Sequence, residues 1–139
     1  MCTNTLSPEI VQEIDSTLSS IEHTEKLVIG SDEHLDIILE IRQSFIEMSS
    51  NLVSLTDHIE SMFAVINMEA AEKLIAKAFP VFSIANKLVK ATLDIPEIYK
   101  YVREPLQQFE QEVDGLFEII GDLARYKVRN SDDYSSFIF

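Results

Sequence analysis

The sequence predicts an all-α fold, an antiparallel up-and-down four-helix bundle with kinked third and fourth helices. Apolar residues recur every three or four positions along most of the chain, which is the period of an amphipathic helix. Start and stop signals divide the chain into four such segments, and the short connections between them favour antiparallel neighbours. No strand signal competes, because the one Asp-Gly pair, Asp114-Gly115, lies inside a helical repeat.

Length and composition suit a single folded domain. The chain has 139 residues, of which 46% are hydrophobic, and only 3 glycines. A chain of this size can bury a sizeable core without disulfides or a structural metal. We therefore expect one four-helix bundle over residues 1–129 and a polar C-terminal tail over residues 130–139.

The first helix is predicted over residues 8–29. Ser7 is placed to cap it, and Pro8 suits the first helical position because its missing N–H would have no partner there. Gly30 is predicted to end the helix in a left-handed conformation. The apolar stripe of this helix consists of Ile10, Ile14, Leu18, Ile21 and Val28.

The second helix, predicted over residues 33–66 with Ser31 or Asp32 as its cap, carries the strongest pattern. Its seam combines two apolar series, each repeating every seven positions: Ile38, Phe45, Leu52, Ile59, Ile66, and Ile41, Met48, Leu55, Met62. A flank of four more apolar residues lies beside this seam: Leu35, Leu39, Ile46 and Val53. The flank either packs within the bundle or forms a surface for a partner or a homodimer.

The third helix is predicted over residues 68–92. The register of the apolar seam slips near Asn67, which suits a turn or a new N-cap. Pro80 lies inside this helix and should kink it, because proline removes one backbone hydrogen bond and crowds the preceding turn.

The fourth helix, over residues 95–129, opens with an Asp94 cap. Pro105 either kinks it or splits off a short leading piece. Gly115 and Gly121 each cost roughly 1 kcal/mol relative to alanine in a helix interior. We expect both glycines to mark places where another helix or a bulky ring comes close.

Acidic residues dominate the charge of the chain. The 24 Asp and Glu against 11 Lys and Arg give a net charge of −13, which excludes nucleic-acid binding on electrostatic grounds. Residues 1–66 hold 12 acidic and 2 basic side chains (net −10), whereas residues 67–139 hold 12 and 9 (net −3). Such an acidic half either aids solubility or attracts a basic partner protein and speeds their encounter.

No membrane span is expected, and a cytoplasmic location is predicted. The most apolar window, residues 74–93, is interrupted by Lys77, Lys87 and Lys90, whereas a span needs about 20 nearly uncharged residues. The first residues lack the basic and apolar regions of a secretory signal.

The sequence lacks a recognisable catalytic or cofactor motif, so we predict no enzyme activity, no cofactor and no metal. Bundle di-metal centres use Glu-x-x-His pairs, and none of the three histidines, His23, His34 and His58, has a glutamate three positions earlier. Cys2 is the single cysteine, which excludes an internal disulfide and a cysteine-based zinc site. Gly-rich phosphate loops and nucleophile elbows are also missing.

One short motif bears on phosphoryl transfer. The run His23-Thr24-Glu25-Lys26 resembles the H-x-x-K spacing of histidine phosphotransfer domains, which are four-helix bundles of about this size. The resemblance implies that His23 accepts a phosphoryl group and that Lys26 balances the added charge. The family pattern continues with a small residue, where Leu27 stands in this chain.

Taken together, these features predict a non-enzymatic acidic module that binds another protein, as an adaptor, regulator or inhibitor-like protein. The partner is expected to be a protein, with a basic surface as one option, and a homodimer is an alternative. The contact surfaces predicted for it are the flank of the second helix and the C-terminal Phe137, Ile138 and Phe139. The alternatives are phosphotransfer through His23 and a carrier of a small apolar ligand held near Phe79, Phe82, Phe109 and Phe117.

Overall fold

The structure, a computed structural model, describes residues 6–32 and 34–129, with side chains to residue 126. It contains four α-helices: α1 (Pro8–Ile29), α2 (Leu35–Met62), α3 (Met68–Leu93) and α4 (Pro96–Arg129). A short 3₁₀ turn, η1 (Phe63–Val65), follows α2. The described residues include no strand, and the prediction of an all-α four-helix bundle is confirmed.

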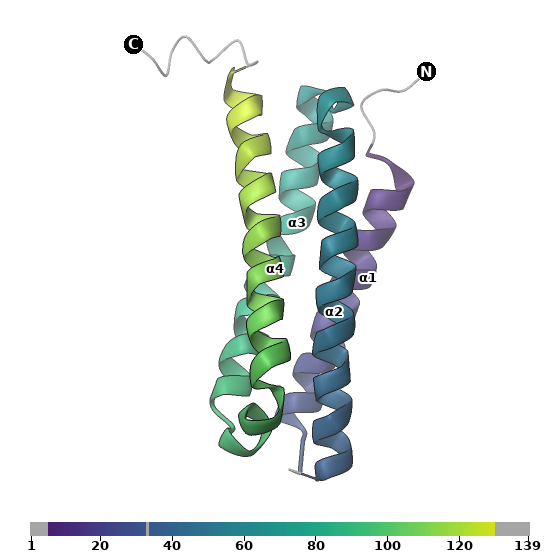
Figure 1. The fold of residues 1–139 in the computed structure, drawn as a ribbon. Coiled ribbons are helices and arrows are strands. Elements are labelled where there is room, and N and C mark those ends of the chain that lie inside the picture. The colour runs from purple at the N-terminus through teal and green to yellow at the C-terminus, as the bar shows by residue number, and fades with distance from the viewer. Residues whose placement is uncertain (1–5, 33, 130–139) are drawn as a thin grey trace.

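Successive helices run in alternating directions, as Figure 1 shows. Helix α1 packs mainly against α2 and α3, and α4 also packs mainly against α2 and α3. The order around the bundle is therefore α1, α2, α4, α3, so that the connection between α2 and α3 crosses one end of the bundle. As a result, α1 and α3 are parallel neighbours, and so are α2 and α4 (Figure 1).

The core follows the predicted seams. Eight of the nine seam residues predicted in the second helical segment are buried, and Met62 is partly buried against them. The Phe45 ring of α2 meets the Phe109 ring of α4 edge-on, with centroids 5.4 Å apart. Burying one such side chain contributes on the order of 1.5–3 kcal/mol, so this shared seam is the main source of stability.

Helix ends differ from the sequence predictions at several places. Gly30 has φ −87°, so it does not end α1 in a left-handed conformation, and that prediction was wrong. Its N–H instead bonds the Lys26 carbonyl at 2.9 Å, which continues the helical pattern. Neither Ser31 nor Asp32 caps α2, because the helix begins later, at Leu35.

The turn between α2 and α3 matches the N-cap predicted at Asn67. The Asn67 side chain accepts a hydrogen bond from the Ala70 N–H at 2.8 Å, as an N-cap does. Helix α2 ends at Met62. Residues 63–65, which the sequence predicted to belong to the second helix, form the 3₁₀ turn instead.

Both internal prolines lie inside continuous helices. Pro80 sits within α3 and Pro105 within α4, so Pro105 does not split off a leading piece. Pro80 is on the exposed side of α3, where water can satisfy the Ala76 carbonyl that proline leaves without its helical donor. None of the helices in the described residues is long and apolar enough to cross a membrane.

Candidate functional site

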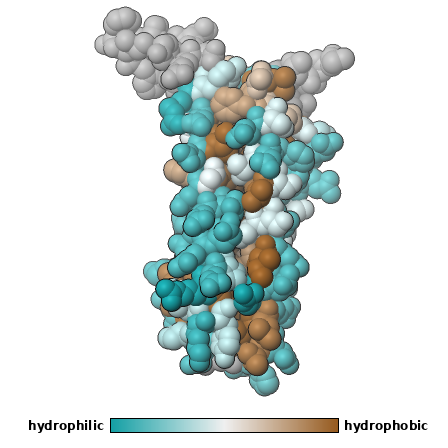
Figure 2. Space-filling view, viewed as in Figure 1, coloured by the Kyte–Doolittle hydropathy of each residue, from teal (hydrophilic) through white to brown (hydrophobic). Residues whose placement is uncertain are grey.

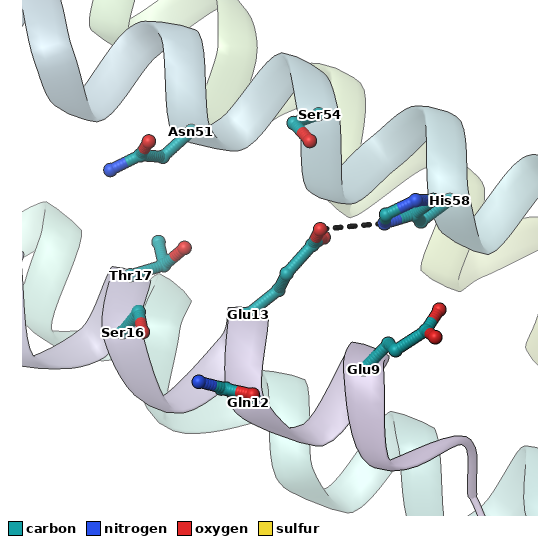
Figure 3. Close-up of a pocket in the computed structure, with 8 residues that line it drawn as sticks. All are labelled: Glu9, Gln12, Glu13, Ser16, Thr17, Asn51, Ser54 and His58. Atoms are coloured by element: carbon teal, nitrogen blue, oxygen red, sulfur yellow. Dashed lines mark ion pairs between the residues drawn. The ribbon is translucent and has the colours of Figure 1, made fainter.

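A polar pocket of about 380 Å³ lies between α1 and α2 (Figure 3). Residues one helical turn apart on each helix line it: Glu9, Gln12, Glu13, Ser16 and Thr17 from α1, and Asn51, Ser54 and His58 from α2. Most bundle interfaces bury apolar side chains, so a pocket lined only by polar residues is a distinct feature of this surface.

An ion pair between Glu13 and His58 stands at one end of this polar pocket. His58 Nδ1 lies 2.6 Å from Glu13 Oε1, and the two side chains are 48% and 27% exposed. The other carboxylate oxygen of Glu13, Oε2, is shielded from solvent and accepts no hydrogen bond from residues 6–32 or 34–129. The pair links α1 to α2 and fixes the orientation of the imidazole ring.

Serine side chains also face the polar pocket. Figure 3 shows the Ser54 hydroxyl directed into it, one turn before His58 on α2. In the described part of the chain, however, no serine or threonine hydroxyl hydrogen-bonds the His58 imidazole; the Ser61 hydroxyl donates to the His58 backbone carbonyl instead. The arrangement therefore holds a carboxylate–imidazole pair without a hydroxyl nucleophile in contact with it.

His23 and Lys26 are both exposed on α1, as the phosphotransfer resemblance requires. His23 lines a second, smaller pocket of about 90 Å³ between α1 and α2, and the Glu47 side chain of α2 lines the same pocket. A phosphoryl group on His23 would therefore have a carboxylate as well as Lys26 for a neighbour.

No metal centre is formed by the described residues. They contain no group of three or more His, Cys, Asp and Glu side chains that could hold an ion. Cys2 lies outside the described residues, and so do Phe137, Ile138 and Phe139 of the predicted partner-binding tail.

The apolar flank predicted on the second helix lies at the surface of α2. The exposed fractions of its residues are 51% for Leu35, 48% for Leu39, 40% for Ile46 and 41% for Val53. Successive residues are turned by about 100° around the helix axis, so the four positions all fall within an arc of about 40° and form one line along the helix. We call this line the α2 stripe, and Figure 2 shows apolar side chains spaced along α2 on this face.

The α2 stripe lies on the side of α2 next to α4, because Glu60, seven residues after Val53, lines a pocket with residues of α4. We call the outer surface between these two helices the outer groove. At one end of this groove a pocket of about 540 Å³ is lined by Glu60 and Phe63 together with Ile119, Asp122, Arg125 and Tyr126 of α4. The Phe63 and Tyr126 rings meet edge-on there, with centroids 5.6 Å apart. This end of the groove thus combines apolar side chains with acidic ones from both helices and with Arg125, which pairs with Asp122.

The four phenylalanines predicted to surround a small apolar ligand do not form one cluster, although two of them pair. Phe109 is buried in the core against Phe45, whereas Phe82 pairs at 5.2 Å with Phe117 between α3 and α4. Phe79 and Phe117 are 66% and 62% exposed. Equal helical spacing cannot distinguish a core aromatic residue from one in a surface pair, so the sequence could not place these four rings relative to one another.

Sequence reasoning missed the Glu13–His58 pair. The two residues are 45 positions apart, and nothing in the helical period of either segment links them. The pairing depends on how far α1 and α2 are displaced along each other.

No family model, no curated protein and no solved structure matches the chain.

Proposed function

We propose that this protein is a non-enzymatic binding module that associates with another protein through the α2 stripe, as an adaptor, regulator or inhibitor-like protein. One observation carries the proposal: four large apolar side chains lie half-exposed in one line on a helix that already packs against two neighbours. The line from Leu35 to Val53 is about 27 Å long at 1.5 Å per residue.

The energetics of exposure support this use of the α2 stripe. Covering the exposed part of each side chain contributes on the order of 1 kcal/mol, so four of them in line provide a useful share of a binding free energy. Single exposed apolar residues are common on proteins, but contiguous ones mark interaction surfaces.

The acidic charge supports a basic partner. The first half of the chain, which forms α1 and α2, carries a net charge of −10, counted as 2 basic minus 12 acidic residues over residues 1–66. Such a field steers a cationic protein towards this side of the molecule and raises the association rate. The proposed setting is the cytoplasm, where a single cysteine stays reduced.

Affinity capture from the native cell with the full chain as bait tests the proposal. We expect a specific protein to bind the wild-type chain, to be lost with Ile46→Asp, and to be retained with Val65→Asp. Val65 is a matched control because it is exposed, apolar and outside the α2 stripe. Equal capture by both variants would contradict the proposal, as would turnover of a small molecule by the purified chain with no partner bound.

Phosphotransfer through His23 is the second candidate, favoured by the exposure of both His23 and Lys26 on one turn of α1. Incubation with acetyl phosphate, followed by intact-mass measurement, tests it. The candidate requires one added phosphate that disappears in His23→Gln and persists in His34→Gln. An unmodified mass, or a phosphate that His23→Gln keeps, would remove it.

A further inference from the structure

We infer that the α2 stripe takes a basic amphipathic helix of another protein, lying in the outer groove between α2 and α4 and passing close to Gly115. The inference rests on the proposed function and adds the form and charge of the partner. Three independent features of the groove lead to it: its register, an unexplained glycine and its acidic rims.

Two ring contacts show how α2 and α4 are aligned along their axes on either side of the groove. Phe45 meets Phe109, and Phe63 meets Tyr126, so parallel helices α2 and α4 stay level along this length. Val53 follows Phe45 by eight residues, and Gly115 and Ile119 follow Phe109 by six and ten. The turn of α4 from Gly115 to Ile119 therefore lies level with the upper end of the α2 stripe.

Gly115 is placed on the groove side of α4. It lies one turn before Ile119, which lines the pocket between α2 and α4, and eleven residues before Tyr126, which contacts Phe63. Eleven residues are close to three full helical turns, so Gly115 and Tyr126 face the same way.

None of the residues that the structure describes explains a glycine at this position. A Cβ atom added to Gly115 would meet nothing within 4 Å, although glycine in a helix interior is unfavourable relative to alanine. The expectation that another helix of the bundle comes close to Gly115 was wrong. Open space above this half-buried glycine instead allows the backbone of a partner helix to approach α4 closely.

The rims of the groove are acidic on both sides. On α2, Asp57 and Glu60 follow Val53 within two turns, whereas Glu47 lies on the other side of the helix, in the pocket between α1 and α2. On α4, Glu112 lies seven residues before Ile119, and Glu104 lies five full turns before Asp122. Asp122 lines the pocket with Glu60 and is paired with Arg125, so Glu104 and Glu112 carry most of the unpaired charge on this rim. Lys and Arg side chains flanking an apolar seam would pair with both rims.

The same charge argues against a second copy of this chain. Two copies joined along their α2 stripes would bring acidic rims together, with a net charge of −13 on each chain. Like charges facing one another across an interface oppose association. A basic partner removes this repulsion.

The spacing of the α2 stripe indicates that the partner segment is a helix. Leu39, Ile46 and Val53 are each seven residues apart, which is the repeat by which two helices pack side by side. An extended strand, with its period of two residues, would not keep contact with this line.

A designed helical peptide about three heptads long provides the probe, with leucine at the two seam positions and lysine on either side. Fluorescence anisotropy measures its Kd for the full chain. We expect the lysine peptide to bind about a hundredfold more tightly than the same peptide with glutamate in place of lysine. Weaker or equal binding of the lysine peptide would overturn the inference, and so would a dimer of this chain that Ile46→Asp dissociates.

Gly115→Gln is the decisive variant, with Gly121→Gln as its matched control. The Cβ site of Gly121 lies 3.7 Å from the Arg125 side chain, an ordinary contact, and the six-residue separation turns Gly121 away from the groove. We expect Gly115→Gln to weaken peptide binding about tenfold and Gly121→Gln to change it less than about twofold. Thermal melting checks that both variants fold.

The two proposals fail in different ways. If Gly115→Gln leaves the Kd unchanged while Ile46→Asp abolishes capture of the cellular partner, the groove-bound helix is wrong and the binding module stands. If Ile46→Asp changes neither measurement, both proposals are wrong.

Discussion

Phe45 and Phe79 show how differently one residue type contributes in this bundle. Phe45 is fully buried between α2 and α4, where its ring meets Phe109, and Phe79 is 66% exposed on α3. Truncating a buried phenylalanine removes its transfer free energy and leaves a cavity, whereas an exposed ring loses little.

We therefore expect Phe45→Ala to lower the free energy of unfolding by about 3–5 kcal/mol. Phe79→Ala is the matched control and should change it by less than about 0.5 kcal/mol. Urea denaturation followed by circular dichroism measures both. A loss of similar size in the two variants would show that the α2–α4 seam is not the centre of the core.

The Glu13–His58 pair is a residue-scale link between α1 and α2. Both side chains keep part of their surface in water, 27% and 48%, and water screens such a pair. The short contact alone is therefore no sign of a large contribution to stability.

A double-mutant cycle with Glu13→Gln and His58→Gln measures the coupling. We expect a coupling free energy of less than about 1 kcal/mol between the two positions, because exposed ion pairs contribute that much at most. The control cycle replaces Glu13 and His34. Glu13 lies near the start of α1 and His34 is the N-cap residue of α2, and the starts of these two antiparallel helices lie at opposite ends of the bundle (Figure 1). A coupling well above this limit would assign the pair a larger structural role.

At the scale of helices, the sequence predicts interiors better than ends. The seven-residue repeat of α2 identifies its buried seam because burial follows from periodicity alone. Ends depend on backbone geometry that the residue type only favours: Gly30 keeps a negative φ, and Ser7 stands at the N-cap without a side-chain bond. The α2 stripe illustrates the same limit, since periodicity left open whether the flank was covered.

The caps of α1 and α3 give an element-scale prediction. Asn67 accepts the Ala70 N–H at 2.8 Å, whereas the Ser7 side chain makes no cap hydrogen bond. Asn67→Ala should lower the free energy of unfolding by about 0.5–2 kcal/mol. Ser7→Ala should change it by a few tenths of a kcal/mol at most. Chemical denaturation compares them, and equal losses would show that the Asn67 side chain does not stabilise α3.

The arrangement of the whole molecule cannot be predicted from helical periodicity. Helical periodicity gives the width of a buried face but not the identity of the helix that covers it, so the crossing of α2 to α3 and the parallel pairing of α1 with α3 came from the structure. The Glu13–His58 pair and the groove beside Gly115 depend on this arrangement. For that reason the candidate surfaces were only partly foreseen, by the residues of the α2 stripe.

The placement of charge in the assembled bundle leads to a last prediction. Acidic α1 and α2 are direct neighbours, and Lys77 of α3 reaches Asp15 of α1 at 3.1 Å, which offsets a small part of the repulsion. With a net charge of −13, long-range repulsion should exceed the few attractive pairs. Salt screens these long-range terms, because the Debye length falls from about 30 Å at 0.01 M to about 8 Å at 0.15 M.

We therefore expect the melting temperature of the isolated chain to rise by several degrees, roughly 2–5 °C, between these salt concentrations. NaCl and KCl should act equally, since screening depends on ionic strength and not on the cation. Over the same range the proposed complex with a basic helix should weaken, because salt screens attraction as well as repulsion. A melting temperature that falls with salt would mean that attractive pairs, such as Lys77 with Asp15, dominate the electrostatics of the folded chain.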